Sequence, residues 1–470
     1  MNGPRPLSSA ALRPPIEQSC YWLAQNPAPA EPPLEGATEA DVVVVGAGLT
    51  GLWTAIRLLE LEPRTRVVVV ERATAAHGAS GRNAGMVGES IDHSYGLMVA
   101  HFGRAEAKHL AILGQENLEE MLRFLAAHGI DCDLERTGTL HVALQESHLK
   151  ELRGDLEDAR ELGVTHLRLL SREETRAEVR SPRYEGAVFN PKGAILDPAK
   201  LVRGLKREAQ RRGAVIYEGT RVTGLAPEGA GVRVATEHGF VRARRAVLGT
   251  SAYSHHLLPG LRFRFMPLYD YVLASEPLTA AQREIIGWKN RQGVTDVRSF
   301  FKYYRLTADH RVVWGTSEAL YHPGNRVDVS CDHSERHYQE LQESFVRHFP
   351  ALGGVAFPYA WGGAICATTR FTPFFGSALG GRVFYGLGYT GHGLGTTHLA
   401  GKILSHLALA RPSPLLDLAL VRRKPFPYPP EPFRGWAVAA VTRALRRVDE
   451  GKRPSPLLRL LDALGIGLSS

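Results

Sequence analysis

Residues 41–72 read DVVVVGAGLTGLWTAIRLLELEPRTRVVVVER, and this stretch decides the fold of the chain. The four consecutive valines at 42–45 form an apolar run without alternation, which is typical of a strand buried on both faces of a parallel sheet. Apolar residues then recur with helical spacing over 52–59, and a second valine run follows at 67–70. The order predicts a strand, a helix and a second, parallel strand.

The turn between the first strand and the helix carries Gly46, Gly48 and Gly51 in GxGxxG spacing. Gly46 permits a tight turn, Gly48 lets the backbone approach a pyrophosphate, and Gly51 lets helix and strand pack closely. The helix N-terminus offers N–H groups and a positive dipole end to phosphates. Glu71 lies 20 residues beyond Gly51, where an acceptor for ribose hydroxyls is expected. These features together predict a nucleotide cofactor, because an ordinary βαβ unit would not require the acid.

Two further glycine-rich stretches favour FAD over a nicotinamide cofactor. The first, HGASGRNAGMVG at 77–88, is nearly filled with small residues, so its backbone can lie against a flat ring, although a merely flexible loop is the alternative. The second, FYGLGYTGHGLGTTHLAGKIL at 384–404, predicts a strand, a turn rich in N–H groups and a helix, which is again an anion cradle. NAD would not explain residues 384–404.

The combination VVVVGAGLTGL, ER and GASGRNAG resembles the D-amino-acid-oxidase-like (DAO) superfamily of flavoproteins. The resemblance implies an α/β fold, in which a Rossmann-like FAD-binding domain of the glutathione-reductase type is interleaved with an α+β substrate domain. It covers roughly residues 18–468. The segments WGG at 361–363 and TTRFTPFFG at 368–376, with the two flanking regions, resemble the branch typified by gamma-glutamylputrescine oxidoreductase.

The chain is expected to divide into an N-terminal arm, three FAD-binding parts, two substrate-domain parts and a C-terminal tail. In chain order these are 1–39 (arm), 40–94 (FAD), 95–184 (substrate), 185–261 (FAD), 262–358 (substrate), 359–410 (FAD) and 411–470 (tail). The tail carries helical patterns and arginines, and packing on the body or a partner is favoured over contact with a membrane surface.

The residues expected to hold FAD come from the three glycine-rich stretches and from two strand ends. They are Gly46, Gly48, Leu49, Thr50, Gly51, Glu71, Arg72, Ser80, Arg82, Asn83, Gly85, Met86, Val222, Gly249, Gly388, Thr390, Gly391, His392 and Gly393. Some relatives attach FAD through a histidine where Arg82 stands here, and others through a cysteine near Gly363, with Cys366 about three residues later. We therefore expect non-covalent FAD. Since the four cysteines form no CxxC pair, no metal site is expected.

The resemblance implies oxidation of the C–N bond of an amine or amino acid, with hydride transfer to the flavin and hydrolysis of the resulting imine. Three residues are the candidates for catalysis. Tyr269 could face a ligand or the core, Arg305 could hold a substrate carboxylate or form a surface salt bridge, and His392 could lie beside the ring or serve only the turn. Further candidates for the substrate face are Tyr271, Tyr303, Tyr304 and Trp361.

Two other readings stay open: an N-demethylating enzyme of the sarcosine-oxidase type, and a non-catalytic flavin-binding redox or interaction protein. The electron acceptor is expected to be oxygen or a quinone or other carrier. The lysine that some relatives use for oxygen activation has no clear match, and Val313 stands in its place.

Bulk properties limit the partners. Hydrophobic residues make up 44% and charged residues 22%, which is typical of a folded globular protein. The formal charge of +9 is scattered, so nucleic-acid binding is not expected, although a positive field suits an anionic cofactor or substrate. The N-terminus lacks an apolar signal region and no apolar run is long enough to span a membrane. A cytoplasmic protein, at most peripheral at the inner face of the membrane, is expected; the oligomeric state is left open.

Overall fold

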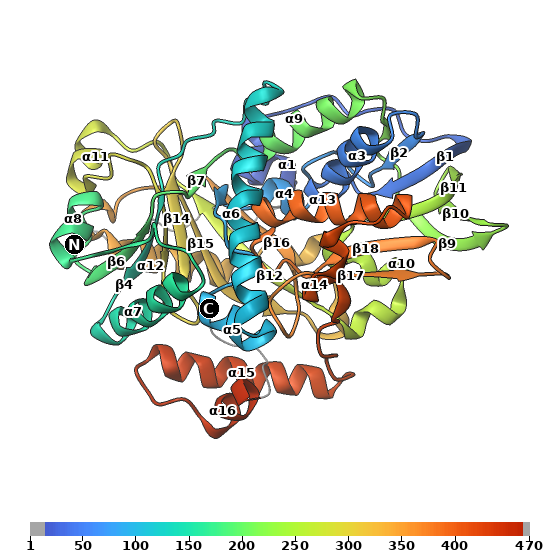
Figure 1. The fold of residues 1–470 in the computed structure, drawn as a ribbon. Coiled ribbons are helices and arrows are strands. Elements are labelled where there is room, and N and C mark those ends of the chain that lie inside the picture. Colours follow the sequence, from blue (N-terminus) through green and yellow to red (C-terminus); the bar gives the residue numbers. More distant parts are fainter. Residues whose placement is uncertain (1–14, 464–470) are drawn as a thin grey trace.

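The computed structural model describes residues 15–463 and is built on two large sheets with helices packed around them (Figure 1). The first sheet has the strand order β17-β18-β11-β1-β2-β8, and β9 and β10 extend it from β11. Its strands are β1 (Gly36–Val45), β2 (Val67–Val70), β8 (Val215–Tyr217), β9 (Val222–Glu228), β10 (Gly231–Thr236), β11 (Gly239–Leu248), β17 (Phe374–Ala378) and β18 (Val383–Leu387).

The predicted strand–helix–strand unit lies at the centre of this sheet. β1 pairs in parallel with β2, with Val42 opposite Val67, and the intervening helix is α3 (Leu49–Leu61). All eight valines of the two runs are buried, because α3 covers one face of these strands and apolar residues of β10 pack on the other. α3 packs against α13 (Gly393–Leu409), which follows the last glycine-rich stretch. The two glycine-rich turns thus lie side by side although more than 300 residues separate them.

The second sheet has the order β16-β12-β15-β14-β13-β4-β6-β5. Its strands are β4 (Thr139–Ala143), β5 (Arg168–Leu170), β6 (Gly186–Asn190), β12 (Met266–Ala274), β13 (Gly293–Asp296), β14 (Lys302–Leu306), β15 (Val312–Tyr321) and β16 (Tyr359–Ala367). β6 and β16 belong to this sheet, whereas the boundaries expected at 185 and 359 assign both strands to the FAD-binding parts. The sequence of a buried strand carries no signal of the sheet it joins, so the sheet membership of β6 and β16 follows only from the structure.

Helices fill the space around the sheets, and a short pair, β3 (Met86–Val87) with β7 (Ala194–Ile195), joins the first loop to the middle of the chain. The remaining helices are α1 (Ile16–Ser19), α2 (Tyr21–Gln25), α4 (Ala79–Arg82), α5 (Tyr95–Phe102), α6 (Arg104–Ala127), α7 (Glu146–Glu161), α8 (Arg172–Glu178), α9 (Pro198–Arg211), α10 (Ser254–Leu257), α11 (Ala280–Ile286), α12 (Glu335–His348), α14 (Ala419–Arg422), α15 (Phe433–Asp449) and α16 (Pro456–Ala463).

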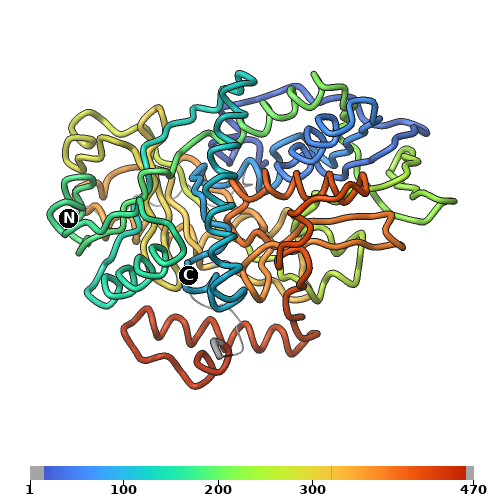
Figure 2. Tube along the Cα trace, viewed as in Figure 1, coloured from blue at the N-terminus to red at the C-terminus, as the bar shows by residue number. Residues whose placement is uncertain are grey.

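Both flanking segments pack on the body. Trp22 of the N-terminal arm is 2% exposed, and the arm is shorter than expected because β1 already begins at Gly36. The tail crosses below both halves of the molecule (Figure 2, red). It is held at one end where Arg434 donates to Asn325, and at the other where the Asp449 carboxylate accepts the backbone N–H groups of Ser299 (2.8 Å) and Phe300 (3.1 Å). Within residues 15–463, no helix combines the length and the apolar character needed to cross a membrane.

Candidate active site

A cavity of about 1160 Å³ is lined by residues of both sheets and by helix α15 of the tail. Pockets for ordinary small ligands occupy about 300–1,000 Å³, so this cavity is large enough for a dinucleotide together with a substrate. Its lining is mostly apolar, and its polar residues fall into two groups that belong to the two halves of the molecule.

The nucleotide end of the cavity is built by the first glycine motif. Gly46 has φ +104°, a left-handed conformation that glycine adopts without strain. A Cβ on Gly51 would lie 1.9 Å from the Gly46 carbonyl oxygen, so only glycine allows α3 to approach β1 this closely. Gly48, Leu49 and Thr50 of the helix N-terminus line the cavity, and the Leu49 N–H donates to Ser80 Oγ over 3.0 Å.

Glu71 lies at the end of β2 and lines the same end of the cavity. Its two carboxylate oxygens accept N–H groups from Ala47 (2.9 Å) and Ala73 (3.0 Å). Burial raises the pKa of Glu71, and these two N–H bonds oppose the shift by favouring the carboxylate. The acid is therefore held in one orientation, as a ribose acceptor would need to be.

The N-terminus of α13 also opens onto the cavity. His392 is its N-cap residue and makes no side-chain capping bond, and Gly391 and Gly393 on either side line the cavity. The His392 ring stacks on His93 at 4.2 Å between ring centroids and 23° between planes. Burial lowers the pKa of both imidazoles, most strongly that of His93, so the stacked pair is neutral at pH 7.

Most of the residues expected to hold FAD line this cavity. They are Gly46, Gly48, Leu49, Thr50, Glu71, Arg72, Ser80, Arg82, Asn83, Met86, Val222, Gly249, Thr390, Gly391, His392 and Gly393. Gly51, Gly85 and Gly388 lie behind the lining and serve packing. A Cβ on Gly85 would lie 2.0 Å from the Leu196 carbonyl oxygen, and one on Gly388 would lie 2.3 Å from Thr368 Cγ2.

This arrangement fits FAD. Two helix N-termini, those of α3 and α13, open onto one cavity, and each is preceded by glycines whose backbone faces the cavity. N–H groups and positive dipole ends at these positions suit a diphosphate and a ring that gains negative charge on reduction. The α3 turn with Glu71 would hold the adenosine diphosphate half, and the turn around Gly391 would lie at the ring.

The expectation that Tyr269 and Tyr271 face a ligand is wrong. Both side chains are fully buried on the face of β12 that points away from the cavity. The Tyr269 hydroxyl donates to the Asp328 carbonyl oxygen (3.1 Å), and the Tyr271 hydroxyl to that of Cys331 (3.0 Å). Because side chains alternate along a strand, the cavity face of β12 carries the intervening residues, among them Asp270.

Arg305 is a structural residue, not the partner of a substrate carboxylate. Its guanidinium is buried and donates from one nitrogen to the carbonyl oxygens of Gly85 (2.9 Å) and Leu196 (2.7 Å). It also lies over the Trp22 ring, 5.1 Å from the centroid. Tyr304, the neighbouring candidate, is a core residue whose hydroxyl bonds to that of Tyr184 over 2.6 Å.

Tyr303, Trp361 and His392 are the candidates on the substrate face that line the cavity. The Tyr303 hydroxyl donates to Asp270 Oδ2 over 2.6 Å. The Trp361 indole N–H donates to the Arg82 carbonyl oxygen over 2.8 Å, while the Arg82 guanidinium pairs with Asp332 at 3.0 Å. Of these three residues, Tyr303 is thus the one whose side chain bonds to another side chain that lines the cavity.

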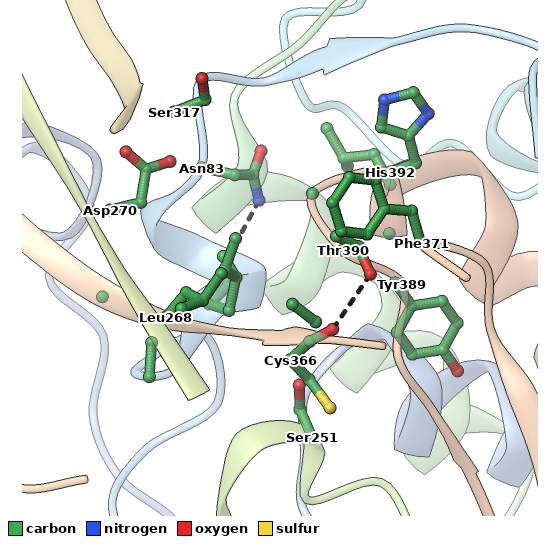
Figure 3. A pocket seen from close by; sticks show the side chains of 18 of the residues that line it. Asn83, Ser251, Leu268, Asp270, Ser317, Cys366, Phe371, Tyr389, Thr390 and His392 are labelled. Atoms are coloured by element: carbon green, nitrogen blue, oxygen red, sulfur yellow. Dashed lines mark hydrogen bonds between the residues drawn. The ribbon is translucent and has the colours of Figure 1, made fainter. Parts of the chain in front are cut away.

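Sequence reasoning missed Asp270 and His141, which both face the cavity. Burial raises the pKa of Asp270 to about 7, against the Tyr303 hydrogen bond. His141 is the exposed position of β4, but its ring is exposed to the cavity inside the protein, and this enclosure lowers its pKa to about 4. The signal was present, because a single ionisable residue interrupts each apolar strand, in PLYDYVLA and in TLHVA. Figure 3 shows Asp270 and Ser317 on one side of the pocket and His392 and Phe371 on the other.

The structure also shows where the residues lie that correspond to the FAD attachment and oxygen-activating positions of relatives. Cys366 lines the cavity, and burial raises the pKa of its thiol, which is therefore neutral and a poor nucleophile. Gly363 lies beside the Arg82 side chain. Val313 is buried and does not line the cavity, and no lysine of residues 15–463 does so.

Comparison with known proteins agrees with this geometry. The family described as DAO, FAD dependent oxidoreductase, matches residues 41–407. The chain is 32% identical to gamma-glutamylputrescine oxidoreductase of Escherichia coli (strain K12) over 395 residues, 84% of this chain and 89% of that protein. It is 30% identical to the probable oxidoreductase OrdL of Rhizobium meliloti (strain 1021) over 400 residues, 85% and 90% of the two chains. Glycine oxidase from Geobacillus kaustophilus has the same fold, with a TM-score of 0.67 at 20% identity over 82% of this chain and 99% of that one.

The chain belongs to the DAO family of FAD-dependent oxidoreductases. The predicted fold class, FAD as the cofactor, and an enzyme that acts on amines or amino acids are confirmed by this membership.

Proposed function

We propose that this enzyme oxidises the C–N bond of an aliphatic amine of the gamma-glutamylputrescine type, using non-covalently bound FAD. The observation that carries the proposal is the shared cavity, which is lined by the N-terminal turns of α3 and α13 and by polar side chains of the second sheet, among them Asp270 and Tyr303. The identity of 32% to gamma-glutamylputrescine oxidoreductase over most of both chains supports the choice of substrate type.

When bound, FAD would accept a hydride, which is a proton with two electrons, from the carbon beside an amine nitrogen that has lost its proton to solvent, leaving a protonated imine that water hydrolyses. The protein contributes position and electrostatics. The neutral His93–His392 pair lines the cavity without adding positive charge that would repel a cationic amine. Helix α15 covers the cavity and limits the entry of water, with Val438 and Val441 in the wall.

The test is product analysis after turnover with a panel of aliphatic amines, gamma-glutamyl amines and N-methyl amino acids. Ammonia together with an aldehyde that retains the carbon chain is the expected product. Formaldehyde released from the N-methyl compounds, with no reaction of the primary amines, would show an N-demethylating enzyme instead. Flavin that stays in solution after the protein is precipitated with acid is expected if FAD is non-covalent, whereas a flavin-labelled peptide containing Cys366 would contradict it.

A further inference from the structure

A row of polar side chains crosses the cavity face of the second sheet. Asp270 on β12, Tyr303 on β14, Thr295 on β13 and His141 on β4 all line the cavity. Strand register sets them in line, since Tyr303 lies opposite Thr295 and Thr295 opposite His141. From β12 to β4 the row crosses four strand-to-strand steps, about 19 Å at the usual spacing of about 4.8 Å.

Gly315 on β15, the strand between β12 and β14, leaves the space in which the first two residues of the row meet. β15 carries Gly315 opposite Tyr303, and a Cβ there would lie 2.2 Å from the Tyr303 ring. Without a side chain at Gly315, the tyrosine ring lies across β15 and its hydroxyl reaches Asp270 Oδ2. This hydrogen bond connects the polar groups of β12 and β14 across the intervening strand β15.

Two atoms of this row have no partner. Asp270 Oδ1 and Thr295 Oγ1 are enclosed, and no donor among the described residues meets hydrogen-bond geometry with either, although the Tyr271 N–H lies near enough to the Asp270 carboxyl to lower its pKa. An enclosed carboxylate oxygen without a donor costs free energy that a bound donor would recover. Two other acids around the cavity differ in this respect, because both of their oxygens accept hydrogen bonds: Glu71 accepts from Ala47 (2.9 Å) and Ala73 (3.0 Å), and Glu89 accepts from His166 (2.8 Å) and Asn190 (2.9 Å).

The arginines that line the cavity are engaged elsewhere. Arg82 pairs with Asp332, Arg434 donates to Asn325, and Arg72 lies over the Tyr253 ring at 4.1 Å. The fourth, Arg221, lies 3.8 Å from Glu237 at the edge of the molecule. Within residues 15–463, the parts of β4, β12, β13 and β14 that line the cavity carry the Asp270 carboxylate, which forms no ion pair, and no arginine or lysine that would bind the carboxylate of an amino acid.

We propose that Asp270 is the substrate-binding residue that pairs with an alkylammonium group, and that the site selects cationic amines over α-amino acids. This inference rests on the proposed function and narrows its substrate class. Tyr303 positions the carboxylate, and Thr295 and His141 provide polar contacts farther along an extended chain. The attraction between Asp270 and an ammonium group is local to the cavity, since the protein as a whole carries a formal charge of +9.

The test uses a probe that binds but cannot form an imine. 2,5-Dimethylhexane-2,5-diamine, which keeps its ammonium N–H donors but has no hydrogen on the carbons beside nitrogen, is titrated into the FAD-loaded enzyme, and the change in flavin absorbance gives a dissociation constant. Asp270→Asn is expected to weaken binding at least tenfold, with FAD content and melting temperature unchanged. The control Asp328→Asn removes the same charge from an exposed site outside the cavity and is expected to leave binding unchanged.

A second variant keeps the test valid if Asp270→Asn does not fold. Tyr303→Phe retains the carboxylate, and it is expected to weaken probe binding at pH 7 and to recover most of the affinity at pH 8.5. A wild-type enzyme that does not bind the probe, or an Asp270→Asn enzyme that binds it as tightly, would overturn the proposal. Probe binding that depends on Asp270, in an enzyme whose flavin no amine reduces, would instead refute the proposed function alone.

Discussion

The Tyr303 hydroxyl and the Asp270 carboxylate, from strands that are not neighbours, are joined by a 2.6 Å hydrogen bond across Gly315. The bond stabilises the charged form of a carboxylate whose pKa burial raises to about 7, and Lys302 on the other face of β14 acts in the same direction. Arg82, whose side chain lies beside Gly363 of β16, forms an ion pair with Asp332 and not with Asp270. Asp270 is thus poised to change charge near neutral pH.

The pH dependence of KM follows from this pair. Because the ionised form binds an ammonium ion, KM for a cationic amine is expected to fall as pH rises through about 7. Tyr303→Phe removes a bond that lowers the Asp270 pKa, so the fall in KM moves to higher pH. Asp270→Asn removes it altogether. A KM profile between pH 6 and 8.5 that is the same in all three enzymes would contradict this role.

Gly51→Ala tests the first glycine turn. The new Cβ would lie 1.9 Å from the Gly46 carbonyl oxygen, a backbone atom that cannot move without displacing β1. Overpacking of this kind costs about 1–3 kcal/mol, so both the FAD content and the melting temperature are expected to fall. Gly154→Ala in α7 is the control, since its Cβ meets nothing within 4 Å and alanine favours a helix. Full FAD occupancy in Gly51→Ala would count against a nucleotide turn here.

Arg305→Met tests the corrected role of that arginine. The change leaves the carbonyl oxygens of Gly85 and Leu196 without this donor, and we expect a loss of about 2–3 kcal/mol in the free energy of unfolding. KM of the fraction that retains FAD is expected to stay within about twofold. A KM raised more than tenfold at unchanged stability would instead return Arg305 to the substrate site.

Val438→Trp tests whether α15 forms a wall of the substrate compartment. The side chain lines the cavity, so the larger indole is expected to raise KM roughly tenfold, about 1.4 kcal/mol, without loss of FAD. Trp436→Ala is the matched control on the same helix, because Trp436 is 65% exposed. Equal steady-state kinetics for Val438→Trp and the wild type would show that substrate does not reach α15.

The nucleotide half of the site could be predicted from the sequence, and the substrate half could not. Gly46, Gly51 and Glu71 obey local rules of turn geometry and spacing, which any βαβ unit around a dinucleotide repeats. Tyr269 and Asp270 follow a rule that is symmetric: a strand has two faces, and the period of two does not say which of them meets the cavity. That choice depends on the pairing of eight strands, some of them more than 200 residues apart.

The roles of Arg305 and of the tail could not be predicted for the same physical reason, since both depend on contacts between distant parts of the chain. An arginine in an aromatic strand could serve a ligand or the backbone, and only the folded chain shows that Gly85 and Leu196 lie within its reach. The helical patterns of the tail predict α15, but the contacts of Asp449 with Ser299 and Phe300, which hold that helix over the cavity, have no sequence signature.

The most direct test of the central claim is the visible spectrum of the purified FAD-loaded enzyme, recorded without oxygen before and after addition of an aliphatic diamine, a gamma-glutamyl amine and an amino acid. We expect an amine to bleach the visible flavin band, and the amino acid to bleach it at least tenfold more slowly. A protein that does not take up FAD, or a flavin that no amine reduces, would contradict it.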